Sequence, residues 1–276
     1  MTMTHATLAK YNALQARLRE LGSAVVAFSA GVDSTVLLKI AVDTLGPENV
    51  LAVTGRSPSI PEAEQNAAAD LAAEFGAKHE FIDTREFEDE NYLANPADRC
   101  FHCKTELFTR LTELMRQRGH RTILSGTNAD DRDDYRPGTQ AATDFQVLSP
   151  LAECGLTKAE IREIAAALGL TIADKPAAPC LSSRVPYGER ITPEKLQRID
   201  AGEAFLRELG FRECRVRHHE NLARIEVPAA EIARFLNEEL RQTINKTFRE
   251  IGFQYVSLDL CGFRSGSLNE VLRVIK

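Results

Sequence analysis

A short run of small and hydroxyl-bearing residues, Ser29-Ala-Gly-Val-Asp-Ser34, could bind a polyphosphate. It follows an apolar stretch typical of a buried strand and opens a helical pattern, so unpaired N–H groups and the positive end of the helix dipole would face the ligand. Ser29 and Ser34 would add donors, and Gly31 would let a phosphate approach the backbone. Asp33 would repel phosphate unless it held a bridging magnesium ion. An ordinary serine-capped turn is the plainer interpretation. Neither a Walker A motif nor G-x-G-x-x-G occurs, so the run favours a pyrophosphate loop.

Residues at the ends of two further predicted strands could complete this site. Strand 122–125 ends in Gly126-Thr-Asn-Ala-Asp-Asp131, at the carboxyl edge where parallel sheets bind ligands. Asp130 or Asp131 could share the magnesium ion, although a solvated acidic loop would give the same pattern. The strand at 50–53 ends in Thr54-Gly-Arg-Ser57, where an adenine would be held. The predicted ATP site therefore comprises Ser29, Gly31, Asp33, Ser34, Thr54, Arg56, Gly126 and Asn128, with magnesium on Asp33, Asp130 and Asp131.

Three of the six cysteines could carry metal or sulfur chemistry. Cys100 and Cys103 form a C-x-x-C pair, and Cys180 lies in a Cys-Leu-Ser-Ser-Arg run. The start of the chain lacks the charged and apolar segments of a signal peptide, and in a reducing compartment clustered cysteines indicate metal binding or catalysis before disulfides. A thioredoxin-like pair, a structural zinc site and unrelated buried thiols are the alternatives. Three thiolates that hold an iron–sulfur cluster with one open iron are the sharper interpretation.

Alternating strand and helix patterns must position these residues. Apolar periodicity predicts strands at 24–28, 50–53, 80–82 and 122–125 and helices at 5–21, 36–45, 61–75, 105–118 and 157–169. This alternation indicates an α/β fold with a parallel sheet and right-handed crossovers. Beyond about residue 190, the predicted elements are helices at 192–208, 229–240 and 242–250 and strands at 213–218, 224–227 and 255–258. They form a small α+β unit, so we expect two domains, 1–188 and 189–276.

Composition narrows the classes of function. The chain has 276 residues, 43% of them hydrophobic, which is enough for a sizeable core. Its apolar runs are far shorter than the roughly 18 residues of a membrane helix. Lys and Arg number 34 against 40 Asp and Glu, a net charge of −6, which argues against tight nonspecific nucleic-acid binding. We expect a cytoplasmic globular protein that binds neither nucleic acid nor a membrane.

Taken together, the motifs resemble those of a known family. Ser29–Ser34 is similar to the S-G-G-x-D-S motif of the PP-loop ATP pyrophosphatases, whose domain is adenine nucleotide α-hydrolase-like. Ala30 occupies the position of the first glycine of the motif, and alanine is tolerated there if its φ is below zero. Further segments closely resemble the LarE family over nearly the whole chain, namely Cys180–Gly188, Asp133–Gly138, Arg215–Arg217, Ala223–Glu226 and Leu258–Gly266.

The resemblance implies an ATP-dependent sulfur transferase of nickel-pincer nucleotide synthesis. A carboxylate of pyridinium-3,5-biscarboxylic acid mononucleotide would attack the α-phosphate of MgATP and release pyrophosphate. A sulfur nucleophile would then displace AMP and leave a thiocarboxylate. Cys180 would be catalytic with Asp33, either by giving up its own sulfur or as a ligand, with Cys100 and Cys103, of a [4Fe-4S] cluster; the C-x-x-C pair places the chain in the cluster group. The family assembles as a homohexamer.

The resemblance also implies where the substrate binds. Arg215 and Arg217 would meet the nucleotide phosphate, since residues two apart on a strand point to the same face. Glu203 and Glu226 match family acids near that site, and Arg184 would face ATP or the adenylate. A solvated face of an edge strand is the alternative for the two strand arginines.

Three other functions compete with this one. A PP-loop tRNA thiolase would need a basic groove and an added RNA-binding module. A nonthiolating amide-forming synthetase would leave the three cysteines unexplained. A regulatory module would bind ATP without chemistry. Pyrophosphate release that depends on the pyridinium nucleotide would separate all three from the sulfur transferase.

Overall fold

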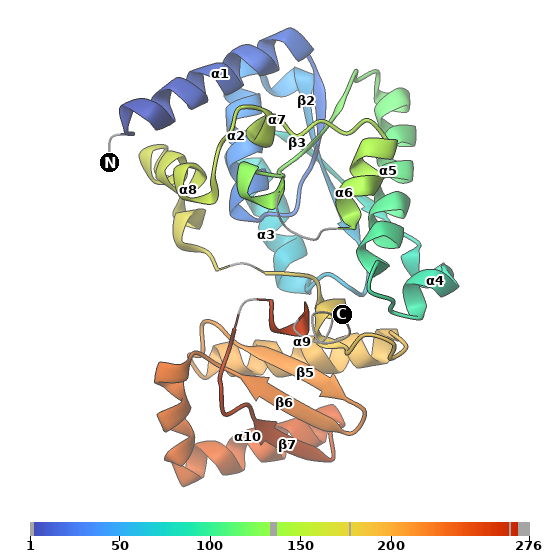
Figure 1. Cartoon of the computed structure of the whole chain (residues 1–276), viewed down its shortest axis with the longest axis vertical. Helices are drawn as coiled ribbons and strands as arrows, with labels where there is room; N and C mark the ends of the chain where they lie inside the picture. The colour runs from blue at the N-terminus through green and yellow to red at the C-terminus, as the bar shows by residue number, and fades with distance from the viewer. Residues whose placement is uncertain (1–2, 133–136, 177, 265, 270–276) are drawn as a thin grey trace. The chain divides into compact units, whose positions relative to one another are not determined.

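The computed structural model of the chain describes residues 3–132, 137–176, 178–264 and 266–269 (Figure 1). Contacts divide it into two compact units, Met1–Glu88 with Asp98–Ala178 and Asp89–Ala97 with Pro179–Lys276. This division falls before the expected boundary at Gly188, because the Gly188 N–H donates to the Asn95 carbonyl at 3.0 Å and the Ile191 N–H to the Leu93 carbonyl at 2.9 Å. Those bonds tie the segment after Pro179 to residues 89–97. The domain limits 1–188 and 189–276 stay a prediction.

The first unit is built on a four-stranded sheet in the order β3-β2-β1-β4. Each neighbouring pair is parallel, with Val26 of β1 opposite Ala52 of β2 and Leu124 of β4. The α/β class predicted from the sequence is confirmed. The strands are β1 Ala24–Ala27, β2 Val50–Arg56, β3 Lys78–Asp83 and β4 Ile123–Ser125.

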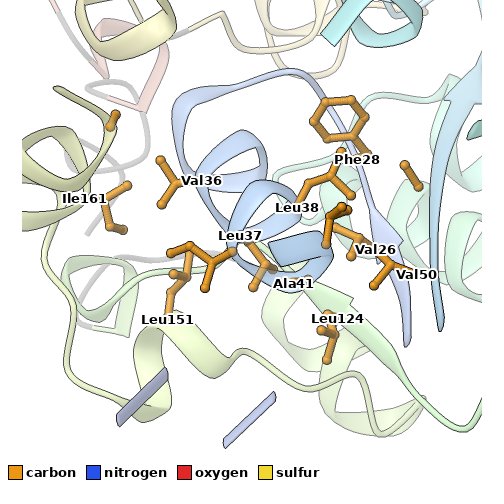
Figure 2. Close-up of a cluster of buried hydrophobic side chains, with 14 of the residues drawn as sticks. Val26, Phe28, Val36, Leu37, Leu38, Ala41, Val50, Leu124, Leu151 and Ile161 are labelled. Carbon is orange, nitrogen blue, oxygen red and sulfur yellow. The ribbon is translucent and has the colours of Figure 1, made fainter. Parts of the chain in front are cut away.

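Helices cover both faces of this sheet, because alternate residues of the central strands enter two different cores. Val26 and Val50 pack with residues of α1, α2, α3 and α8 (Figure 2). Val25, Leu51 and Val53 pack with residues of α5 and α6. The covering helices are α1 His5–Leu21, α2 Val32–Leu45, α3 Glu62–Glu74, α5 Arg99–Arg118, α6 Gly138–Asp144 and α8 Lys158–Ala167.

Local sequence explains the start of α8 but does not show the shortest helices. The Thr157 hydroxyl accepts from the Glu160 N–H while the Glu160 carboxylate accepts from the Thr157 N–H, the capping box that begins α8. The sequence patterns do not predict α4 Glu90–Leu93, α6 or α7 Pro150–Glu153, because helices of four to seven residues are too short to show a 3.6-residue period. None of the helices in the described ranges combines the length and the apolar character that crossing a membrane requires.

The second unit holds a three-stranded sheet in the order β5-β6-β7. β5 Arg215–His219 pairs antiparallel with β6 Leu222–Glu226, and β6 pairs parallel with β7 Tyr255–Leu258. The helices α9 Pro193–Glu208 and α10 Glu238–Ile251 accompany it. The predicted helix at 229–240 is wrong in type and length: the chain forms a 3-10 helix, η6 Ala229–Leu236. Asn237 then ends η6 and caps α10, since its Oδ1 accepts from the Leu240 N–H at 2.9 Å.

Candidate functional site

The predicted phosphate loop joins β1 to α2. The Ser34 hydroxyl lies 3.1 Å from the Ser29 hydroxyl and donates to the Gly31 carbonyl at 3.1 Å. The Gly31 N–H donates to the Ser29 hydroxyl at 3.4 Å. These bonds shape the loop, and the first N–H groups of a helix have no partner within the helix. The loop therefore presents the start of α2 at the carboxyl end of β1, where a phosphate group can be held.

Ala30 has a left-handed backbone, with φ of 54°. The condition that alanine keep φ below zero at this motif position is therefore not met, and the conformation costs about 1–2 kcal/mol in an L-residue. Lys175 helps to hold it, because its Nζ donates to the Ala30 carbonyl at 3.1 Å. No sequence pattern predicts this role for Lys175, because it lies 145 residues after Ala30 and belongs to no motif.

Asp33 lies beside Asn128, which follows β4. The Asn128 side-chain amide donates to Asp33 Oδ2 at 2.9 Å. Burial raises the pKa of Asp33, the hydrogen bond from Asn128 opposes this rise, and the nearby Asp131 carboxylate adds to it. Asn128 is fully buried, and its Oδ1 has no hydrogen-bond partner among the described residues. A carboxylate disfavoured as a bare anion, beside an unsatisfied amide oxygen, fits a hard cation such as Mg²⁺.

The two acids after Asn128 hold the loop onto α8. Asp130 accepts from the Lys158 N–H at 2.8 Å. The Asp131 carboxylate pairs with Lys158 Nζ at 3.0 Å and accepts from the Asn128 N–H at 3.3 Å. These contacts give both acids a positioning role for the strand end that carries Asn128. Magnesium binding by Asp130 and Asp131 stays a prediction.

Gly126 brings the end of β4 against the phosphate loop. A Cβ at this position would lie 2.8 Å from the Ser34 nitrogen and 3.0 Å from the Ser34 Cα, and backbone atoms cannot move aside as a flexible side chain can.

We expect Gly126→Ala to displace the start of α2 and to reduce ATP-dependent pyrophosphate release about 100-fold, the effect of a misplacement near 1 Å. Steady-state kinetics and a thermal melt that confirms folding would check this. Wild-type kinetics in a folded variant would contradict the close approach.

Thr54 and Arg56 lie on β2, as predicted, and both are engaged within the sheet. The buried Thr54 hydroxyl donates to the Phe28 carbonyl at 2.8 Å and lies 2.9 Å from Nε2 of His79. Because the hydroxyl has one proton, His79 must be the donor in the second contact. Arg56 donates to Asp83 at 3.1 Å. Thr54 thus braces the end of β1 just before Ser29, and adenine binding by Thr54 and Arg56 stays a prediction.

The cysteines of the proposed cluster lie in both units. Cys100 and Cys103 lie near the start of α5 and form no disulfide, and three residues apart they share one face of the helix. Cys180 is a free, half-buried thiol in the second unit. Within the part of the chain that the structure describes, no three His, Cys, Asp or Glu side chains form a metal-binding group. Two cysteines on one face of the start of α5 suit two ligands of a cluster, and the full set stays a prediction. Asp133 to Arg136, from one of the family-like segments, lie outside the described residues.

In the second unit, a buried ion pair fixes the backbone at Cys180. Arg184 is 2% exposed and Glu203 is fully buried, and two hydrogen bonds of 2.8 and 3.0 Å join them. The same guanidinium donates to the carbonyls of Pro179 at 2.6 Å and Cys180 at 3.0 Å. Arg184 is therefore a positioning residue for Cys180, and its predicted contact with ATP or the adenylate stays a prediction.

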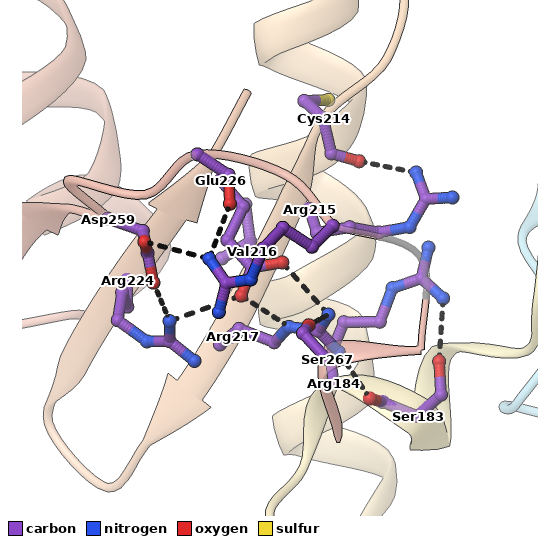
Figure 3. Close-up of polar contacts among 12 residues, drawn as sticks. Ser183, Arg184, Cys214, Arg215, Val216, Arg217, Arg224, Glu226, Asp259 and Ser267 are labelled. Atoms are coloured by element: carbon purple, nitrogen blue, oxygen red, sulfur yellow. Dashed lines mark hydrogen bonds and ion pairs between the residues drawn. The ribbon is translucent and has the colours of Figure 1, made fainter. Parts of the chain in front are cut away.

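Arg215 and Arg217 lie on one face of β5, as their spacing predicts (Figure 3). Arg217 donates to Glu226 at 3.0 and 2.9 Å and to the Ser183 carbonyl at 2.7 Å. The Arg215 guanidinium lies 4.9 Å from the centre of the Phe263 ring. Burial lowers the pKa of Arg215, and the Arg184 cation lowers it further. Both strand arginines are buried, so the alternative of a solvated strand face is wrong.

Comparison with known proteins connects these features to a family. The NAD synthase family model matches residues 8–101. An uncharacterised protein of Synechocystis is 48% identical over 253 residues, 92% of this chain and 94% of its own length. The pyridinium-3,5-bisthiocarboxylic acid mononucleotide synthase of Lactiplantibacillus plantarum is 39% identical over 268 residues, 97% of this chain and 96% of its own. Argininosuccinate synthase of Pyrococcus furiosus is 31% identical over 169 residues, 55% of this chain and 40% of its own.

The argininosuccinate synthase likeness is confined to about half of this chain, whereas the Lactiplantibacillus plantarum relative aligns with both compact units. The phosphate loop between β1 and α2 lies within the range that the NAD synthase model matches. By this full-length similarity and this loop, the chain belongs to the LarE family of pyridinium-3,5-bisthiocarboxylic acid mononucleotide synthases and is an ATP-dependent sulfurtransferase.

Proposed function

We propose that the chain converts a carboxylate of pyridinium-3,5-biscarboxylic acid mononucleotide into a thiocarboxylate, with MgATP as co-substrate, in nickel-pincer cofactor synthesis. The observation that carries this proposal is the 39% identity over 97% of the chain to a synthase named for the bisthiocarboxylic acid product. Such a reaction needs a site for ATP, a site for an anionic nucleotide and a source of sulfur. The phosphate loop would supply the first, the arginine-rich face of β5 the second, and Cys180, positioned by Arg184, would take part in the third.

The first step is adenylation of the carboxylate. A carboxylate oxygen forms a bond to the α-phosphorus, and the bond from that phosphorus to the bridging oxygen of pyrophosphate breaks. The N–H groups at the start of α2 hold the polyphosphate, and Ser29 and Ser34 shape the loop around it. Asp33, oriented by Asn128, would hold Mg²⁺, which when bound neutralises the charge of the departing pyrophosphate.

Positive charge in the second unit supports binding of an anionic nucleotide. Several guanidinium groups gather with carboxylates on and beside β5, and guanidinium groups are favoured partners of phosphate because they form charge-assisted, bidentate hydrogen bonds. Arg224, for example, pairs with both Glu226 and Asp259. The cations are Arg184, Arg215, Arg217 and Arg224, and the carboxylates are Glu203, Glu226 and Asp259.

The sulfur source is the finer part of the proposal. Cys100, Cys103 and Cys180 would hold a [4Fe-4S] cluster, which when bound supplies a transferable sulfide on its open iron. The position of Cys100 and Cys103 on one face of α5 supports this, and Arg184 fixes the backbone of Cys180. Donation of the Cys180 sulfur itself is the second candidate, supported by Arg184, which donates to the Cys180 carbonyl at 3.0 Å and so positions this free thiol. By family membership we further propose a homohexamer in the cytoplasm.

Pyrophosphate release tests the adenylation step. Protein purified without oxygen should release pyrophosphate from MgATP only when the pyridinium nucleotide is present, and mass spectrometry should show oxygen replaced by sulfur in the product. Asp33→Asn should slow this release at least about 100-fold, because it removes the charge that holds the metal. Release that depends on tRNA, or an amide product without sulfur, would replace the proposal with one of its rivals.

A further inference from the structure

The phosphate loop has no cation of its own. Ser29 to Ser34 contain no lysine or arginine, and the charged residue among them, Asp33, is an acid. MgATP and magnesium pyrophosphate are both anionic, so other segments must supply positive charge close to the loop. Stabilisation of charge on the leaving group is also a main source of catalysis in phosphoryl chemistry.

Lys175 is bonded directly to this loop. Its Nζ donates to the Ala30 carbonyl at 3.1 Å and to the Glu64 carboxylate at 2.5 Å. The side chains of Lys175 and Glu64 are 24% and 21% exposed, so this pair is partly shielded from water. Since Ala30 lies between Ser29 and Gly31, the ammonium lies next to the backbone that would cradle the phosphates.

The main chain of Lys175 is anchored while its tip is held by exchangeable contacts. Arg162 on α8 donates to the carbonyl of Ala173 and, at 3.0 Å, to that of Lys175. An ammonium carries three N–H donors, and two serve Ala30 and Glu64. Lys175 thus has a fixed base, a flexible stem and a partner that a stronger anion can displace.

We propose that Lys175 binds the β- and γ-phosphates of ATP at the phosphate loop and that Glu64 holds its ammonium until the nucleotide arrives. A polyphosphate carries more charge than one carboxylate and offers more oxygens, so the ammonium exchanges Glu64 for phosphate. The same contact then stabilises pyrophosphate as it leaves. This inference rests on ATP binding by the loop, which is part of the proposed function.

A purely structural role for Lys175 makes a different prediction. If the lysine serves only to hold the left-handed Ala30, its loss distorts the loop and weakens every ligand of the loop alike. If it binds the outer phosphates, its loss weakens ligands that carry them and spares AMP. The comparison of ATP, pyrophosphate and AMP therefore separates the two roles.

Calorimetric titration of the full chain, with magnesium present, provides this comparison. We expect Lys175→Met to weaken ATP and pyrophosphate binding about 10- to 100-fold, the range for one charge-assisted hydrogen bond, and to leave AMP binding within about twofold. Lys175→Arg should restore part of the affinity. Glu64→Gln should tighten ATP binding several-fold, because it removes the competing carboxylate. Equal weakening of ATP and AMP in Lys175→Met, or no weakening at all, would overturn the inference.

Lys10 offers a matched control in the same unit. Its Nζ also bonds one carbonyl, that of Gly155 at 2.8 Å, and one carboxylate, that of Glu160 at 2.7 Å. Lys10→Met should leave the affinities for all three ligands unchanged. A wild-type chain that binds no ATP would contradict the proposed function itself, whereas ATP binding by wild type and by Lys175→Met with equal affinity contradicts this inference alone.

Discussion

Replacing Arg184 with Met should lower the free energy of unfolding by about 3–5 kcal/mol, the cost of leaving one charge of a buried pair uncompensated. Glu203 is fully buried, and its remaining cation, Arg207, is 39% exposed and reaches it with one bond of 3.0 Å. The substitution also leaves the carbonyls of Pro179 and Cys180 without their shared donor. Chemical denaturation followed by circular dichroism measures the loss.

Two variants show whether the loss comes from the buried charge. Arg184→Met combined with Glu203→Leu should recover much of the stability, because no unpaired charge is then buried. Arg190 forms an exposed pair with Glu90, the two side chains being 53% and 75% exposed. Arg190→Met should therefore change the free energy of unfolding by less than about 1 kcal/mol. An Arg184→Met loss no larger than that of Arg190→Met would show that the buried pair does not stabilise the second unit.

Cys180→Ala should abolish sulfur transfer while pyrophosphate release continues. Adenylation needs the phosphate loop and the substrate, whereas the second step needs the thiol at position 180 either as a cluster ligand or as the sulfur donor. We expect no thiocarboxylate product from the variant in mass spectrometry. Loss of pyrophosphate release as well would place Cys180 in the first step instead of the second.

Cys100→Ala then separates the two sulfur sources. On the cluster proposal, the wild type purified without oxygen holds about four iron and four labile sulfide per chain, and Cys100→Ala loses both together with sulfur transfer. Cys261→Ala is the control, since Cys261 is an exposed free thiol outside the proposed site. A wild type without iron, whose Cys180 loses its sulfur in a single turnover, would replace the cluster with sacrifice of the cysteine.

Patterns that repeat along the chain could be predicted from the sequence, and contacts across the chain could not. The apolar runs of β1 and β2 predict a buried parallel sheet. A strand followed by the loop at Ser29 predicts a phosphate site. Nothing periodic marks the contact of Lys175 with Ala30, nor the positive φ of Ala30 that glycine would ordinarily take. The predicted role of Arg184 likewise missed Glu203, because a buried pair is visible only when α9 is placed against residue 184.

Residues 89–97 belong to the second unit although they precede the first unit's later part, and this order has a consequence for synthesis on the ribosome. The Tyr92 hydroxyl lies 2.6 Å from that of Ser182, a partner that emerges 90 residues later. The Asn95 side-chain amide likewise donates to the carbonyls of Val185 and Pro186, which emerge 90 and 91 residues later. Residues 98–178, which complete the first unit, leave the ribosome in the interval. The nascent chain therefore carries an unfinished piece of its second unit while the first can already close, and the ring of Tyr92, which is buried in the folded chain, lacks its later-made partners during that delay.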